Sequence, residues 1–222
     1  MTAQPQPTLS LLEAITQRRS ARAFKPDPIP TATLHEILRL GTQAPSAFNL
    51  QPWRFIVLQS ADAKAKLSPC AFGQRQVTEA PVVLICCGDT TAAEADNIEA
   101  IIALGQQQGA MPDAFANYMR TGIPQGMRDR PSFTHMEAWI NRQVMLAVGH
   151  IALVAKAYDV DSCPMEGFNT SAIQETFGLP ETVIPCCLLP LGYAADPIKQ
   201  YGGRFPLDRI CYGDRYGEPF PS

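Results

Sequence analysis

The chain has 222 residues, 46% of them hydrophobic, so it can bury one substantial core and is expected to form a single domain over residues 1–222. Its 18 basic and 21 acidic side chains give a formal net charge of −3, which offers no electrostatic reason to expect nucleic acid or an anionic membrane surface as a partner. No apolar run reaches the roughly 18 residues of a membrane span, and the first residues lack a signal peptide, so a cytoplasmic protein is expected.

The seven cysteines are an odd number in a chain without an export signal, so we expect free thiols in a reducing compartment. The pairs Cys86-Cys87 and Cys186-Cys187 lie in apolar, strand-like runs, where neighbouring side chains point to opposite faces. Each pair is poorly placed to share a metal or form an unstrained disulfide, so we interpret all four as small buried hydrophobic residues. A thiol or metal protein that uses these pairs is the alternative. The three histidines lack partners at metal-binding spacing, and no metal site is predicted.

The first helix is predicted to begin at the capping box Ser-Leu-Leu-Glu of residues 10–13. Leu11, Leu12 and Ile15 are expected on its buried side. Residues 1–7, which precede the helix, are expected to be a short disordered lead-in.

A basic segment follows this helix and contains Arg18, Arg19, Ser20 and Arg22. Arginine offers bidentate, charge-assisted hydrogen bonds and serine adds a neutral donor, so the segment can bind a phosphate. A solvated basic face is the alternative.

A short polar turn at residues 45–53 separates a helix from a strand. Its two prolines and an asparagine indicate a fixed, irregular backbone rather than a flexible loop. Ser46, Asn49 and Gln51 can hydrogen-bond a neutral polar ligand, but the turn offers no nucleophile, metal ligand or strong base.

The remaining elements follow from periodicity and apolar runs. Strands are expected at 53–59, 81–88 and 183–193, and helices at 31–40, 61–67, 97–107, 113–120, 134–158 and 170–177. Residues 89–131 are interpreted as a surface excursion that Gly122, Pro124 and Gly126 interrupt after the helix at 113–120. Residues 196–203 are expected to form a loop, and residues 205–212 to be extended.

Residues 164–167, Pro-Met-Glu-Gly, precede the helix at 170–177. Their backbone N–H and carbonyl groups can face the edge of a ligand. An ordinary loop between a strand and a helix is the alternative.

Five segments, taken together, resemble the FMN-dependent nitroreductase family, in the family's order and at compatible spacing. They are residues 18–24, 45–53, 143–149, 164–168 and 203–207. The resemblance implies an α+β fold with a central mixed sheet flanked by helices and a C-terminal segment swapped onto the partner subunit. It also implies a homodimer with FMN at the interface.

The resemblance implies a set of cofactor-binding residues and no catalytic side chain, because the chemistry takes place at N5 of FMN. The set is Arg18, Arg19, Ser20, Arg22, Pro45, Ser46, Asn49, Gln76, Gln143, Pro164, Met165, Glu166, Gly167 and Arg204. Within it, Arg18, Ser20 and Arg204 match phosphate ligands. Pro45, Ser46 and Asn49 match contacts that come from the second subunit. Phe48 and Phe72 match positions beside the substrate, and Phe115 in the excursion is a further candidate for the substrate pocket.

Two positions depart from the family's pattern. Gly202 stands where some members have a lysine two residues before the arginine matched by Arg204, and Gln76 stands where relatives often have a lysine near the flavin. The phosphate charge would then be met by Arg18 and Arg204, with Arg22 as a further cation.

The implied activity is reduction of electron-poor aromatics, such as nitroarenes and quinones, by ping-pong hydride transfer from NADH or NADPH through FMN. Alternatives on the same scaffold are a flavin-dependent dehalogenase and an oxygen-dependent flavin enzyme. A non-enzymatic flavin carrier is a further alternative.

Overall fold

The computed structural model describes residues 5–129, 135–196 and 200–220. Its centre is a four-stranded sheet in the order β1-β2-β4-β3. The strands are β1 (Trp53–Leu58), β2 (Val82–Asp89), β3 (Asp161–Ser162) and β4 (Val183–Gly192). The α+β class is confirmed, but all neighbouring pairs are antiparallel, so the sheet formed by these strands is not mixed. A parallel pairing occurs in the isolated bridge between Ser20 and Ser162.

Nine α-helices and two 3-10 helices are present in the described residues. The α-helices are α1 (Leu11–Gln17), α2 (Thr31–Gly41), α3 (Ala61–Cys70), α4 (Arg75–Glu79), α5 (Ala95–Gln107), α6 (Asp113–Asp129), α7 (Met136–Ala157), α8 (Thr170–Phe177) and α9 (Leu207–Ile210), and the 3-10 helices are η1 (Ala47–Asn49) and η2 (Thr90–Ala93). The expected lead-in at 1–4, the end of the excursion at 130–131, the expected helix start at Thr134 and residues 197–199 of the expected loop lie outside the described residues.

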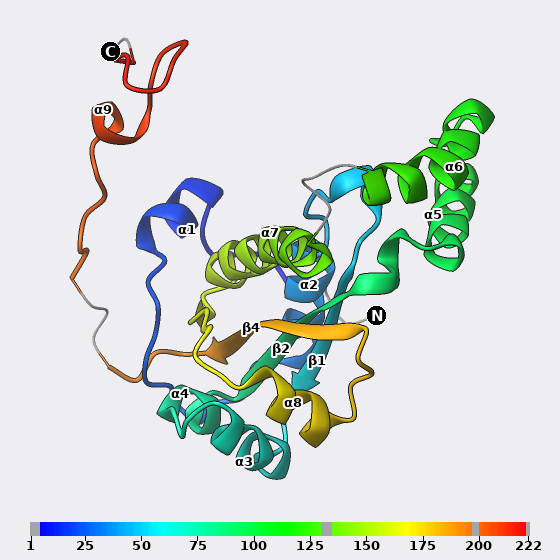
Figure 1. The fold of residues 1–222 in the computed structure, drawn as a ribbon. Helices are drawn as coiled ribbons and strands as arrows, with labels where there is room; N and C mark the ends of the chain where they lie inside the picture. The colour runs from blue at the N-terminus through cyan, green and yellow to red at the C-terminus, as the bar shows by residue number, and fades with distance from the viewer. Residues whose placement is uncertain (1–4, 130–134, 197–199, 221–222) are drawn as a thin grey trace.

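Helices cover both faces of the sheet, with α7 and α2 on one side and α3, α4 and α8 on the other (Figure 1). Each side has its own buried cluster: Leu84 of β2 packs in the cluster that contains Ile140 of α7, and Ile85 packs in the cluster that contains Leu67 of α3. Because successive strand side chains alternate between faces, a strand covered on both sides has to be apolar throughout. This explains the continuous apolar run in β2.

α7 is the central helix of the fold. Val144, Val148 and Ile151 follow helical spacing and are buried. By length and composition alone α7 could cross a membrane, but half of the qualifying stretch is buried inside the protein, as in a core helix. The helix approaches β2 closely at Gly88, where a Cβ atom would overlap Ile140 Cγ2 and lie 3.1 Å from Val144 Cγ2.

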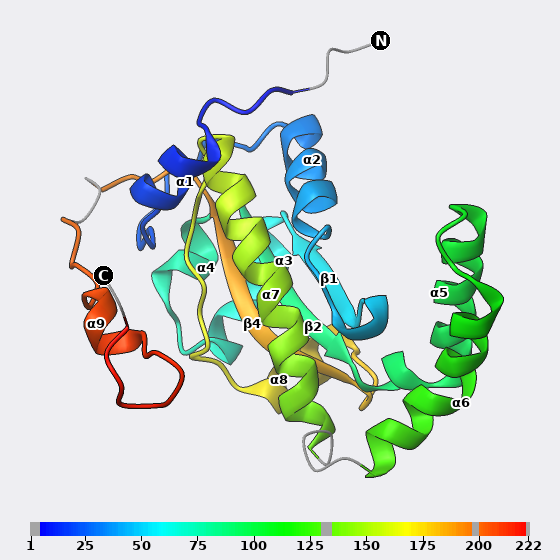
Figure 2. The ribbon, with the colours of Figure 1, turned by 90° about the horizontal axis from the view of Figure 1, so that it is seen from above.

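Several expectations about local structure are wrong. α6 continues to Asp129 through Pro124, because Met119, Ile123 and Met127 form a buried stripe along it. Burying each of these side chains is worth about 1.5–3 kcal/mol. Together they offset the roughly 3 kcal/mol that a proline costs inside a helix. Figure 2 shows α5 and α6 at one side of the fold, and their buried side chains, such as Ile98 and Met119, belong to the same cluster as Ile140 of α7.

The apolar side of α1 is also misassigned by the sequence pattern. Leu11, Leu12 and Ile15 are 65%, 74% and 50% exposed, and Ala14 is the residue that α1 buries. The helix has only seven residues, contacts α7 and buries this one small side chain, while its leucines face outward.

Residues 200–220, here called the C-terminal arm, extend away from the domain (Figure 1). The expected extended stretch at 205–212 instead contains the short helix α9, which buries none of its residues. Large apolar side chains of the arm are at least half exposed: Tyr201, Phe205, Leu207, Ile210, Tyr216 and Phe220. Their exposure leaves the arm without a hydrophobic core of its own.

The cysteines of the two central strands are buried and free, as expected. Cys86 and Cys87 belong to different clusters, on opposite faces of β2. Burial raises the pKa of Cys86 well above its ordinary value and raises the pKa of Cys87, Cys186 and Cys187 to about 12. These thiols are therefore protonated and poorly nucleophilic at neutral pH.

We predict that replacing Gly88 by alanine lowers the free energy of unfolding by about 1–3 kcal/mol, because the new methyl group must displace Ile140. The matched control is Gly126→Ala in α6, where a Cβ meets nothing within 4 Å. This control should be stabilising by up to about 1 kcal/mol, since alanine favours a helix over glycine. Urea unfolding of the two variants would contradict the prediction if Gly88→Ala were as stable as the parent.

A second prediction concerns pH. The unfolded chain ionises cysteine near its ordinary pKa of 9.0, whereas the folded chain keeps Cys87, Cys186 and Cys187 protonated until about pH 12. The folded state then binds more protons, so the free energy of unfolding should fall as the pH rises above about 8.5.

A thiol reagent at pH 7.5 should label Cys211 first, because the other six cysteines are buried, and Cys211→Ser should abolish the fast phase. Rapid labelling of several thiols in the folded protein would contradict this.

Candidate functional site

Three arginines converge on one cavity at the junction of α1, α7 and the C-terminal arm. The cavity has a volume of about 740 Å³ and is lined by Ile15, Thr16, Arg18, Arg19, Leu153, Tyr201 and Arg204. Arg18 and Arg19 follow the last residue of α1, and Arg204 comes from the arm. None of these lining residues is acidic, so the cavity carries three positive charges without a neutralising carboxylate.

The arginines are held by backbone oxygens and by an aromatic ring. Arg19 Nη1 donates to the carbonyl oxygens of Thr16 and Arg18 at 2.8 and 2.7 Å, and Arg204 Nη1 donates to Gly203 O at 2.8 Å. Arg19 Nε is buried and has no hydrogen-bond partner. Buried polar groups are rarely left unpaired, so this N–H group indicates an acceptor that the protein itself does not supply.

Ser20 lies beside this cavity at the edge of the sheet. It forms an isolated parallel bridge with Ser162 of β3, and Ala21 N donates to Ser162 O at 3.1 Å. The bridge fixes the basic segment to β3. A phosphate in the cavity would meet charge-assisted donors from arginine, the side chain whose planar fork matches phosphate oxygens.

The buried thiol of Cys163 interacts both with arginines of the basic segment and with Gln76 of α4. Burial raises the pKa of Cys163, and the nearby guanidinium of Arg22, a hydrogen bond with the Gln76 side chain, and Arg18 counter part of that rise. Gln76 thus contacts Cys163, the residue between β3 and Pro164, and the charges of Arg22 and Arg18 act on the same thiol.

The turn at residues 164–167 is fixed on both sides. Met165 exchanges two backbone hydrogen bonds with Leu188 of β4, at 2.8 and 2.9 Å. Gln74 Nε2 donates to Gly167 O at 2.8 Å, and a Cβ on Gly167 would lie 3.2 Å from that nitrogen. Glu166 and Pro164 are exposed, so the turn presents its backbone at the surface while Met165 anchors it.

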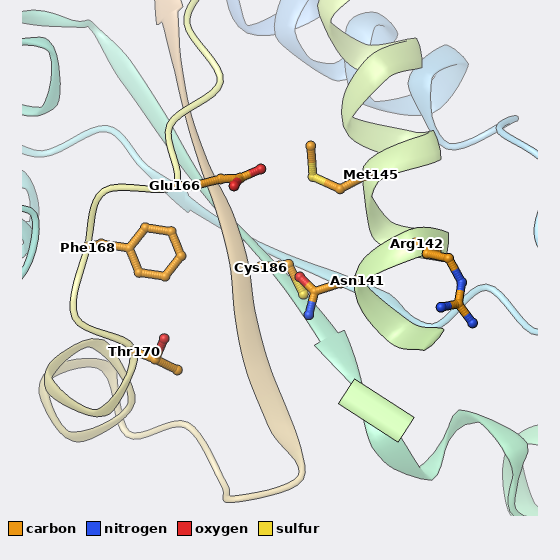
Figure 3. Close-up of a pocket in the computed structure, with 7 residues that line it drawn as sticks. All are labelled: Asn141, Arg142, Met145, Glu166, Phe168, Thr170 and Cys186. Atoms are coloured by element: carbon orange, nitrogen blue, oxygen red, sulfur yellow. The ribbon is translucent and has the colours of Figure 1, made fainter. Parts of the chain in front are cut away.

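A second cavity, of about 490 Å³, lies between this turn and the N-terminal half of α7. It is lined by Asn141, Arg142, Met145, Glu166, Phe168, Thr170 and Cys186. Glu166 and Met145 point toward each other across it, whereas Arg142 points away along the outer side of α7 (Figure 3). The cavity combines apolar walls with a carboxylate, an amide and a hydroxyl, which suits an amphipathic small molecule.

The polar turn before β1 is strained. Phe48, Asn49 and Gln51 have φ angles of 54°, 57° and 47°, in the left-handed region that favours glycine. Such residues cost about 1–3 kcal/mol each and persist where the surroundings impose them.

Hydrogen bonds from three directions impose this conformation. Ala47 N donates to Gln143 Oε1 of α7 at 2.8 Å, and Gln51 N donates to Ser46 Oγ at 3.0 Å. Asn97 Nδ2 of α5 donates to Leu50 O at 2.9 Å. Within the protomer, Gln143 thus braces the turn, while Pro45 and Asn49 remain exposed.

An aromatic cluster joins this turn to the excursion. Tyr118 of α6 lies 6.2 Å from Phe48 and 6.1 Å from Phe115, measured between ring centroids. Two of the three predicted substrate-pocket residues are therefore connected through Tyr118. Phe72 lies apart from them, in the turn between α3 and α4, and is 70% exposed.

The predicted cofactor residues thus form two groups within one chain. One group surrounds the three-arginine cavity, which Leu153 of α7 lines, and continues to the 164–167 turn. The other is the 45–51 turn, which is held by Gln143. Ten residues of helix separate Gln143 from Leu153, or about 15 Å along the axis. Within one chain, the 45–51 turn therefore lies well away from the three arginines.

Several residues of the site were not predicted. Tyr201 lies against two arginines, Gln74 holds the 164–167 turn, and Asn97 holds the 45–51 turn. Each acts over a long stretch of sequence, so a local motif could not reveal it. No cluster of three or more His, Cys, Asp or Glu side chains that could hold a metal ion occurs in residues 5–129, 135–196 and 200–220.

Comparisons with known proteins place this geometry in a family. Residues 15–193 match the family model described as Nitroreductase family. A protein named NADH dehydrogenase from Thermus thermophilus is 35% identical over 205 residues, covering 92% of this chain and 96% of its own. The Bacillus subtilis protein YodC, named as a candidate NAD(P)H nitroreductase, is 34% identical over 200 residues, covering 90% and 96% of the two chains.

The fold is similar to solved structures of the same family. The crystal structure of a nitroreductase candidate from Exiguobacterium sibiricum in complex with FMN matches with a TM-score of 0.81 and 31% identity, covering 93% of this chain and 98% of that one. The nitroreductase-like fold and the oxidoreductase class expected from the five sequence segments are confirmed. The chain belongs to the Nitroreductase family.

Proposed function

We propose that the chain binds FMN, with the phosphate in the three-arginine cavity and the flavin ring against the 164–167 turn. The observation that carries the proposal is the cavity itself: Arg18, Arg19 and Arg204 line it without a carboxylate, and the buried Nε of Arg19 lacks an acceptor. A phosphate would supply that acceptor and neutralise the charges. The residues present therefore fit the group that the Exiguobacterium structure contains.

The rest of the proposed cofactor site extends from this cavity toward the 164–167 turn. Gln76, which hydrogen-bonds Cys163, and Arg22, whose charge acts on the same thiol, would hold the polar end of the ring, and Arg22 would favour negative charge there. Ser20 would add a neutral donor near the phosphate. The exposed backbone of Pro164, Glu166 and Gly167 would face the ring edge, in an orientation fixed by Met165 and Gln74.

The chemistry that FMN supplies when bound is hydride transfer from NADH or NADPH to an electron-poor aromatic, such as a nitroarene or quinone, in ping-pong fashion. The protein's part is to bind, orient and exclude water. Phe48, Phe72 and Phe115 are proposed to border the substrate, and the cluster of Phe48, Tyr118 and Phe115 would offer it aromatic faces.

The proposed active unit is a homodimer, because one chain leaves Pro45, Ser46, Asn49 and Gln143 in a group separate from the arginines. A second copy could bring this group to the ring. Exposed apolar side chains support such an interface: Leu11 and Leu12 of α1, Leu146 of α7, and the arm. The arm is proposed to pack on the partner, which would bury its apolar residues.

A spectroscopic experiment tests the flavin proposal. Purified protein reconstituted with FMN should show flavin absorbance that bleaches on anaerobic addition of NADH or NADPH and recovers on addition of nitrobenzene. Aniline, which has the same ring but accepts no electrons, should not restore the absorbance. Protein that neither retains nor binds FMN would refute the cofactor proposal, and bound flavin that no nicotinamide bleaches would instead indicate a flavin carrier.

A pair of charge variants tests the dimer. Leu207→Asp and Ile210→Asp lie on exposed positions of α9, so a single protomer should fold normally. If α9 packs on a partner, each variant buries a charge and should weaken dimerisation at least about tenfold, measured by light scattering over a dilution series. Leu104→Asp on α5, also at an exposed leucine, is the matched control and should leave the mass unchanged. Equal dissociation constants for all three variants and the parent would refute this role of the arm.

A further inference from the structure

Tyr201 lies close to two of the cavity's arginines. Arg19 Cζ is 4.6 Å from the centroid of the Tyr201 ring, and Arg204 Cζ is 5.6 Å from it. Both distances are within the range in which a guanidinium is attracted to an aromatic face. We infer that Tyr201 is a positioning residue that holds these two guanidiniums ready for the phosphate group of a flavin nucleotide. The inference rests on the proposed function and adds a residue to it.

The ring is needed because of the electrostatics of the cavity. Arg18, Arg19 and Arg204 carry like charges, and no acidic residue lines the cavity to hold them in place. Arg19 and Arg204 each donate to backbone oxygens of their own segment, and these hydrogen bonds do not hold the two like charges near each other. An aromatic face attracts each cation without neutralising it, so the positive charge stays available to the ligand. A carboxylate in the same place would compete with the phosphate.

The local backbone is suited to this arrangement. Tyr201 is followed by Gly202 and Gly203, and Gly203 has a φ of 84°, which glycine adopts readily. This conformation lets the chain turn within two residues, so that Arg204 and Tyr201, both on the arm, meet over the same cavity as Arg19 of the domain. Gly202 carries no charge of its own. Tyr201 thus orders Arg19 and Arg204, and the two glycines between Tyr201 and Arg204 add no further positive charge.

The consequence is a selective one. Arg19 and Arg204 would contact only the phosphate, so Tyr201 should affect the affinity for FMN and leave the affinity for riboflavin, which lacks the phosphate, unchanged. If Tyr201 had a merely structural role, replacing it would lower the affinity for FMN and for riboflavin alike. The dissociation constant of riboflavin divided by that of FMN therefore separates the two roles. This ratio falls if Tyr201 positions the phosphate site, and it stays unchanged if the substitution damages the whole site.

The experiment compares FMN and riboflavin binding to the full-length apoprotein by flavin fluorescence. Tyr201→Leu keeps an apolar side chain but removes the π face, and it should raise the FMN dissociation constant roughly three- to tenfold while that of riboflavin changes less than about twofold. Tyr201→Phe keeps the ring and should restore the parent's ratio. Arg204→Ala, which removes one cation, should lower the ratio at least as far as Tyr201→Leu.

A control outside the arm is Leu104→Ala on α5, an exposed apolar residue that lines neither cavity. Its ratio should equal the parent's. The inference is overturned if Tyr201→Leu binds FMN as tightly as the parent, if it loses both ligands equally, or if Leu104→Ala reproduces its effect. A parent protein that binds neither FMN nor riboflavin would instead refute the proposed function, and the role of Tyr201 with it.

Discussion

The contact between α7 and β2 at Gly88 sets the geometry of the whole domain. Because Gly88 has no side chain, Ile140 and Val144 seat directly on the strand. The position of α7 then determines where Gln143 and Leu153 lie, and each of these residues belongs to one of the two groups of candidate site residues. A shift of the helix on the sheet would move both groups together. The packing of α7 on β2 therefore also determines the positions of Gln143 and Leu153 in the site.

The two groups are built by different physical means. The 45–51 turn is held by neutral hydrogen bonds that maintain three strained residues, and it is rigid before any ligand arrives. The three-arginine cavity is instead a concentration of like charge, stabilised by backbone oxygens and by Tyr201. A fixed polar edge suits recognition of a flat ring, whereas a cationic cavity suits a phosphate at the end of a chain.

The sequence was informative where a signal is local. The capping box of Ser10 and Glu13 forms, α8 ends at Gly178 in the left-handed conformation, and β2 lies covered on both faces. The motif segments also identified the family, because each lies within a few neighbouring residues. The site residues that those segments supplied lie in two groups, and their roles remain proposals.

Long-range packing could not be predicted in the same way. The exposure of Leu11 and Leu12 depends on which side of α1 meets α7, and an amphipathic pattern does not tell a core from a surface that awaits a partner. The helix past Pro124 depends on a buried stripe whose cover comes from elsewhere in the fold. The contact of Tyr201 with Arg19 spans most of the chain. In each case tertiary contacts outweigh local propensity.

The C-terminal arm has a thermodynamic consequence. It carries both Arg204, which lines the cavity, and the exposed apolar residues of α9. On the proposed assignment, two binding events hold the arm in place: phosphate binding through Arg204, and packing of its apolar residues on the second subunit. Whichever event comes first relieves the other of that ordering cost, and by reciprocity each must strengthen the other by the same factor. Flavin content would then depend on protein concentration, with dilution releasing cofactor and subunit as one linked process.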